Sequence, residues 1–187
     1  WVVSGSPAGN RRCRRCIGLG MVSSAALPPE ALSFLSDLAA NNNRDWFHAN
    51  KGRHERELRD PWRHFVESIC LNLREMHPDF AGVLAKDCIF RIHRDTRFSK
   101  EKTPYKLNVA AGISAGGKQS SDPGVYVQLS AETWMIGGGA YWLSKEELHA
   151  VRNHLVAHRR AWQAATLRED FVAHFGKILG ERNKRLP

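Results

Sequence analysis

Six basic side chains lie close together in FRIHRDTRFSKEKTPYK, residues 90–106, and only two acids accompany them. A guanidinium group offers a planar pair of donors that matches a phosphate or carboxylate, and an ammonium group supplies a point charge. Pro104 fixes its own φ and favours an extended Thr103, which stiffens the segment and reduces the entropy lost on binding. We therefore expect an anion-binding site. Its predicted ligand-binding residues are Arg91, Arg94, Arg97, Lys100, Lys102 and Lys106, with Arg44 from an upstream helix.

Two side chains in this segment could take part in proton transfer. Asp95 lies between two arginines, where it could orient them or act as a base, and Tyr105 could donate a hydroxyl hydrogen bond. The opposite interpretation is that Asp95 and Glu101 form ion pairs with the neighbouring arginines or with Lys102, so that the segment is an internal salt-bridge network. The pattern leaves open whether the chain is an enzyme.

Charge and aromatic content separate the candidate ligands. The 28 basic and 19 acidic residues give a net charge of +9, and setting aside the four arginines of residues 1–20 leaves +5. We favour a phosphorylated or carboxylated small molecule. The alternative is a nucleic-acid-binding module, which needs aromatic rings among the cations, and the segment offers only Phe98 and Tyr105. A third interpretation is a structural or interaction protein whose basic segment binds no ligand.

The remaining motifs predict no metal site and no cofactor. Gly137–139 match neither the phosphate-binding loop nor the dinucleotide fingerprint, so a bulge or turn is the favoured interpretation. Cys13 and Cys16 are half of a zinc site without a second half. His154 and His158 have helical spacing but no accompanying acid, which favours a pair of solvated side chains.

The organisation of the chain follows from a change of composition near Met21. Residues 1–20 contain four arginines, no acid and no hydrophobic periodicity, so we expect a non-native or disordered leader. Residues 21–187 are expected to form a single domain. Because no apolar run is long enough to cross a bilayer, we expect no membrane partner. Cys70 and Cys88 lie in apolar surroundings, which is typical of small buried side chains in a reducing cytoplasm.

The elements that must position the basic segment are helices, then strands, then helices. Apolar spacing predicts helices that begin at Pro28–Pro29, after Asn43 and at Pro61, the last with a stripe formed by Trp62, Phe65, Val66, Ile69 and Leu73. Alternation predicts strands at 88–93, 107–114, 125–130 and 132–139. Ser144 and Glu147 form a capping box before further helices to about residue 175. This order predicts an α+β fold: N-terminal helices packed on an antiparallel sheet, followed by C-terminal helices.

Three stretches carry a resemblance to a known family: NNNRDWFHANK, FRIHRDTRFSKEKTPYK and WMIGGGAYWL. With these stretches, the sequence from about residue 30 to 187 resembles the bacterial family called domain of unknown function 2461. The resemblance implies no particular activity. It also implies that the chain lacks a C-terminal segment, because family members usually continue for a few tens of residues beyond the position of Lys184-Arg185.

Overall fold

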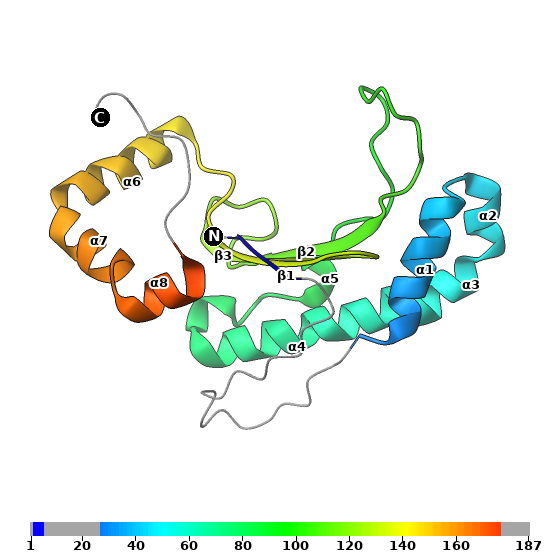
Figure 1. Cartoon of the computed structure of the whole chain (residues 1–187), viewed down its shortest axis with the longest axis horizontal. Coiled ribbons are helices and arrows are strands. Elements are labelled where there is room, and N and C mark those ends of the chain that lie inside the picture. The colour runs from blue at the N-terminus through cyan, green and yellow to red at the C-terminus, as the bar shows by residue number, and fades with distance from the viewer. Residues whose placement is uncertain (1, 6–26, 177–187) are drawn as a thin grey trace.

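The computed structural model describes residues 2–5 and 27–176 of the 187. Helices precede and follow an antiparallel sheet, so the predicted α+β class is confirmed (Figure 1). Before the three main strands come α1 (Pro29–Ala40), α2 (Arg44–Ala49), α3 (Lys51–Arg53), the π-helix η1 (His54–Arg59), α4 (Asp60–Met76), the 3-10 helix η2 (Pro78–Phe80) and α5 (Ala85–Cys88). The strands are β1 (Val2–Gly5), β2 (Asn108–Ser114), β3 (Gly124–Ser130) and β4 (Trp134–Gly139), and α6 (Lys145–Ala157), α7 (Arg159–Thr166) and α8 (Glu169–Phe175) follow.

The sheet has the strand order β1-β4-β3-β2, with every neighbouring pair antiparallel. Strands β2, β3 and β4 form the predicted meander, and their bounds lie within two residues of the expected ones. Strand β1 comes from the predicted leader and pairs with β4. The remainder of that leader, with Cys13 and Cys16, lies outside the described residues.

The N-terminal helices cover one face of the sheet and form the core with it. Val109, Ala111 and Ile113 of β2 alternate toward α1 and α4, as do Val127 and Leu129 of β3. The predicted stripe of α4 is confirmed, because its members are buried or pack against this core. Among the described residues no such helical cover lies on the opposite face of the sheet, which is formed by the alternate positions Ala110, Gly112, Tyr126, Gln128 and Met135.

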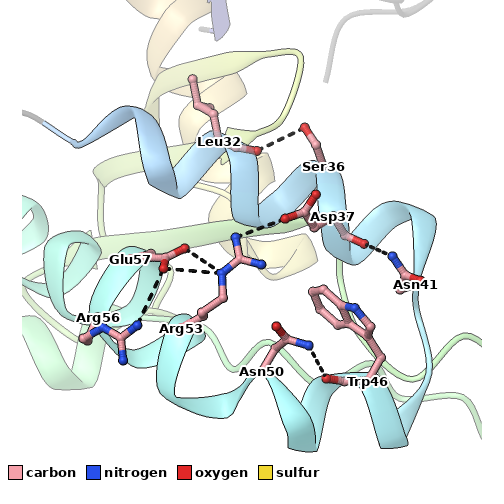
Figure 2. Close-up of polar contacts among 9 residues, drawn as sticks. All are labelled: Leu32, Ser36, Asp37, Asn41, Trp46, Asn50, Arg53, Arg56 and Glu57. Atoms are coloured by element: carbon pink, nitrogen blue, oxygen red, sulfur yellow. Dashed lines mark hydrogen bonds and ion pairs between the residues drawn. The ribbon is translucent and has the colours of Figure 1, made fainter.

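One helical run connects α3, η1 and α4 without a break, although the sequence predicted a new helix at Pro61. Proline lacks an N–H group and its ring clashes with the carbonyl one turn earlier. The π-helical turn of η1 immediately precedes Pro61 and provides the wider turn that accommodates the ring. Arg53 anchors this run to α1: its guanidinium group lies 3.0 Å from Asp37 Oδ2 and 3.1 Å from Glu57 Oε2 (Figure 2).

The predicted strand at 88–93 is wrong. Residues up to Cys88 belong to α5, and two isolated bridges follow, Ile89 with Ala111 and His93 with Tyr105. A bend at Ile92 breaks the alternation, because the chain bonds first to β2 and then to residues 104–106. Ile92 therefore packs against the core while Phe90 lies on the open face of the sheet, and the two do not share a face as alternation predicted.

The C-terminal helices curve away from the sheet (Figure 1). Helix α6 begins with the predicted capping box, in which Ser144 and Glu147 bond each other's backbone N–H groups. None of its side chains is buried among the described residues. No helix in the described part of the chain is long and apolar enough to cross a membrane.

Candidate functional site

The basic segment forms a long loop between α5 and β2, above one end of the sheet (Figure 1). Its two arms are joined at the base, where Arg94 N donates to Pro104 O at 2.9 Å and Lys106 N donates to Ile92 O at 2.8 Å. The bridge between His93 and Tyr105 lies between these bonds. Residues at the base are therefore held in register across the loop, while residues 95–103 form its outer part.

Asn42 ties the base of the loop to the N-terminal helices. Its side-chain amide donates to Tyr105 O at 2.9 Å, and its carbonyl oxygen accepts from Tyr105 N at 3.1 Å. The Tyr105 ring is 3% exposed and stacks on Phe47, with the ring centroids 4.0 Å apart. The candidate proton donor Tyr105 thus belongs to the hydrophobic core and fixes the loop in place.

The asparagine next to Asn42 makes different contacts. Asn43 caps α2, where its side chain accepts from Trp46 N at 2.9 Å. Asn50 donates from its side chain to Trp46 O at 2.9 Å (Figure 2). The tie from Asn42 to Tyr105 spans 63 positions of the chain and has no signal in the sequence.

The outer part of the loop is held by its own charges. Asp95 accepts two bonds from Arg97, at 3.0 Å to Nε and 2.7 Å to Nη2. Arg94 donates to Glu101 Oε2 at 2.9 Å and to Thr103 Oγ1 at 2.6 Å, while Lys102 Nζ donates to Thr96 O at 2.8 Å. Arg94 and Arg97 thus pair with acids inside the loop, whereas Lys102 bonds to a backbone carbonyl.

The same ion pair weakens Asp95 as a candidate base. Hydrogen bonds from the Arg97 side chain and backbone hold the pKa of the Asp95 carboxyl far below its usual range. A general base acts best when its pKa lies near the working pH. The environment of Asp95 therefore favours an ion pair with Arg97 and disfavours acceptance of a proton at neutral pH.

Two of the predicted cations lie together on the open face of the sheet. Arg91 and Lys106 line a cavity of about 300 Å³. Neither side chain has a hydrogen bond or ion pair among the described residues, and no acid lines this cavity. Burial, and then the nearby Arg91, lower the pKa of the Lys106 ammonium group. The other lining residues are Phe90, Asn108, Ala110, Tyr126 and Gln128.

A second cavity of about 530 Å³ lies beside the first, and both are lined by Phe90, Tyr126 and Gln128. Of the residues that line it, the sequence had drawn attention to Gly137–139 but not to Lys118. Lys118 joins it from the loop between β2 and β3: its Nζ donates to Ile89 O at 3.0 Å and lies 5.8 Å from the centre of the Phe90 ring. Nothing in the sequence around Lys118 links it to Phe90, since only the fold brings the two together.

Gly137–139 border the larger cavity, and the prediction of a bulge or turn there is wrong. All three residues lie in β4 and pair with β3 in unbroken register, from Gly139 opposite Gly124 to Gly137 opposite Tyr126. Tyr141 and Trp142 follow directly and also line the cavity. Arg44 and Lys100 are exposed and line neither cavity.

A family model described as conserved hypothetical protein (DUF2461) matches residues 30–187. The chain belongs to this family. The match confirms the resemblance carried by the three sequence stretches, and it includes both cavities and the basic loop of this DUF2461 member. No curated protein and no solved structure gives a significant match.

The open face combines positive charge with aromatic surface. Tyr126 donates its hydroxyl hydrogen to Gln128 Oε1 at 2.7 Å, and burial raises the pKa of this hydroxyl above its usual value. The tyrosine is therefore neutral at physiological pH. Arg91 and Lys106 supply positive charge, and Phe90 and Tyr126 supply apolar surface. Within the described residues, no group of three or more potential metal ligands is present.

Proposed function

We propose that this DUF2461 member binds a small phosphorylated or carboxylated molecule on the open face of its sheet. Arg91 and Lys106 are its charge partners. The observation that supports this is their convergence on one cavity that no acid lines among the described residues. Two like charges at a partly desolvated surface repel each other, and an anion bound between them attracts both and offsets that repulsion.

The remaining cations of the motif have a different role in this proposal. Arg94, Arg97 and Lys102 are engaged within the loop, so they hold its shape and thereby place Lys106. Arg44 and Lys100 lie outside the cavities and contribute only long-range attraction for the ligand. The ligand-binding set thus narrows from the seven residues predicted by sequence to two, with Lys118 added at the edge.

The nucleic-acid alternative is less favoured. Binding of nucleic acid requires several exposed aromatic rings among the cations of the loop. Tyr105 is buried in the core, so of the two candidate rings Phe98, which is 95% exposed, is the one that could stack on a base. A cytoplasmic location accompanies the proposal. It is supported by Cys70 and Cys88, which are both buried free thiols.

The experiment is thermal unfolding of the full chain with phosphate, sugar phosphates, dicarboxylates and short oligonucleotides. A ligand at 100 times its dissociation constant stabilises the folded state by about 2.7 kcal/mol, which raises the melting temperature by roughly 5–10 °C. Arg91→Ala and Lys106→Ala are expected to abolish this rise. Arg152→Ala removes the same charge from α6, away from both cavities, and is expected to leave the rise unchanged.

Two results would contradict the proposal. If no small anion raises the melting temperature of the parent chain, the open face is not an anion site. If only oligonucleotides do so and about 0.2 M salt abolishes the effect, the chain is a nucleic-acid-binding module, because such binding depends steeply on salt.

A further inference from the structure

The geometry points to a ligand that carries a planar aromatic ring beside its anionic group, as a mononucleotide does. This inference rests on the proposed function and names the ligand class of the same site. The anion would lie between Arg91 and Lys106 in the smaller cavity, and the ring would lie in the larger one.

The first observation is the size and continuity of the open face. The cavity with the two cations is about 300 Å³, and the adjoining cavity is about 530 Å³. Phe90, Tyr126 and Gln128 line both, so one ligand can contact all of this surface. Pockets for small ligands span roughly 300–1,000 Å³, and a bare phosphate or carboxylate would leave the larger cavity empty.

The second observation is the aromatic surface around the larger cavity. Tyr126 is 36% exposed, Trp142 53% and Tyr141 85%. The rings of Tyr141 and Trp142 contact each other edge to face, with centroids 5.2 Å apart, so the pair has a defined shape although it is exposed. Large aromatic side chains around a concave surface are typical of sites that stack on a flat ring.

The third observation is the absence of side chains beside Tyr126 in the sheet. Its two cross-strand partners are Gly112 of β2 and Gly137 of β4. A ring in a sheet normally packs against its cross-strand neighbours. Phe90 and Lys118 cover Gly112, because a Cβ there would lie 3.5 Å from the Phe90 ring and 3.4 Å from Lys118 O. A Cβ at Gly139, two residues beyond Gly137 in β4, would meet nothing within 4 Å among the described residues, so the surface at this end of β4 can accept a flat group.

The fourth observation is the uneven distribution of charge. The larger cavity contains one acid, Asp122, which accepts from Ser120 Oγ at 2.8 Å, and one cation, Lys118, so its formal charges balance. The smaller cavity contains two cations and no acid among the described residues, so the uncompensated positive charge lies there. The surface therefore fits a molecule with its negative charge at one end and a neutral ring at the other.

Binding of AMP, ribose 5-phosphate and inorganic phosphate to the full chain, measured by calorimetry, tests the inference. We expect AMP to bind at least about fivefold more tightly than ribose 5-phosphate, because base stacking on an aromatic ring contributes about 1–3 kcal/mol. Trp142→Ala should weaken AMP binding to the level of ribose 5-phosphate and leave ribose 5-phosphate binding unchanged, because Trp142 lines only the larger of the two cavities. Tyr126→Leu should also weaken AMP binding. Trp162→Ala on α7 is the matched control, since that exposed ring lines neither cavity.

The outcomes separate this inference from the proposed function. If AMP and ribose 5-phosphate bind with equal affinity, and Arg91→Ala abolishes binding of both, the inference that the ligand carries an aromatic ring is refuted and the proposed anion site stands. If none of the three probes binds, the inference is refuted and so is a phosphorylated ligand, and the anion site then depends on the result with dicarboxylates in the unfolding experiment. If AMP binds tightly but Trp142→Ala and Tyr126→Leu have no effect, the ring does not lie on the open face and the inference is refuted.

Discussion

The three consecutive asparagines at 41–43 should differ sharply in what they contribute to stability. Asn41 donates to Asp37 O within its own helix, at an exposed position (Figure 2). Asn43 caps α2. Asn42 makes two bonds to the backbone of Tyr105 at a half-buried position. Because the residue type is the same at all three positions, replacement by Ala removes the same atoms each time.

The expected losses follow from these contacts. A hydrogen bond contributes about 1 kcal/mol net, and a polar group left without a partner in a partly buried place costs about 1–3 kcal/mol. Asn42→Ala breaks two bonds and leaves both backbone groups of Tyr105 without them, so the free energy of unfolding should fall by about 2–3 kcal/mol. Loss of the Asn43 cap should cost about 1 kcal/mol. Asn41→Ala should cost about 0.5 kcal/mol or less, because water replaces its exposed bond.

Denaturant unfolding of the three variants measures these differences. The midpoint should shift most for Asn42→Ala and least for Asn41→Ala, with the slope of the transition unchanged. Amide hydrogen exchange gives a second readout: the N–H of Tyr105, which donates to Asn42, should exchange faster only in Asn42→Ala. Equal midpoints for the Asn41 and Asn42 variants, or unchanged exchange at Tyr105, would refute the tie between the helices and the loop.

Three further predictions concern the sheet, the loop and α6. Gly124→Ala would place a Cβ 2.3 Å from a backbone carbonyl of β2, so it should cost about 1–3 kcal/mol in chemical unfolding, whereas Gly82→Ala meets nothing within 4 Å and should change stability by under about 0.5 kcal/mol. Hydrogen bonds from Arg97 lower the pKa of the Asp95 carboxyl. The stabilisation from this pair is therefore complete above the ordinary pKa of 3.8 and is lost as the pH falls toward the lowered pKa. In Arg97→Ala, the pKa of Asp95 measured by NMR titration of its carboxyl group should return close to 3.8. Ser144→Ala should speed amide exchange in the first turn of α6 but leave the global unfolding midpoint nearly unchanged, because α6 buries no side chain among the described residues.

Local signals in the sequence were sufficient for most helices and strands. The stripe of α4, the cap at Asn43 and the capping box at Ser144 each depend on residues within one or two turns, and all are confirmed. The prediction of a strand at 88–93 was wrong because it depends on contacts with residues that are distant in the sequence. Its alternation was real, but its hydrogen bonds are divided between β2 and residues 104–106, and a sequence pattern cannot show which partner each residue takes.

The sequence alone showed that the segment is basic. It did not show which of its cations pair within the loop and which line the cavity. The loop acids bond the cations within their reach, Arg94 and Arg97, while Arg91 lies at the base of the loop. Lys106 lies 15 positions after Arg91, and the bond from Lys106 N to Ile92 O brings the two onto the same face. This pairing is a property of the closed loop rather than of either residue.

The two roles depend on each other. Arg91 and Lys106 repel each other, so their closeness opposes closure of the loop. The pKa of Lys106 is lowered first by burial and then by Arg91. The bonds of the outer loop and the two bonds from Asn42 to Tyr105 act in the other direction, and together they hold the like charges close. In the proposed function, a ligand anion would offset the repulsion without requiring any movement of the loop. The network would then not compete with the anion site as an explanation of the motif, because two cations held close before the ligand arrives would bind it at a smaller entropic cost.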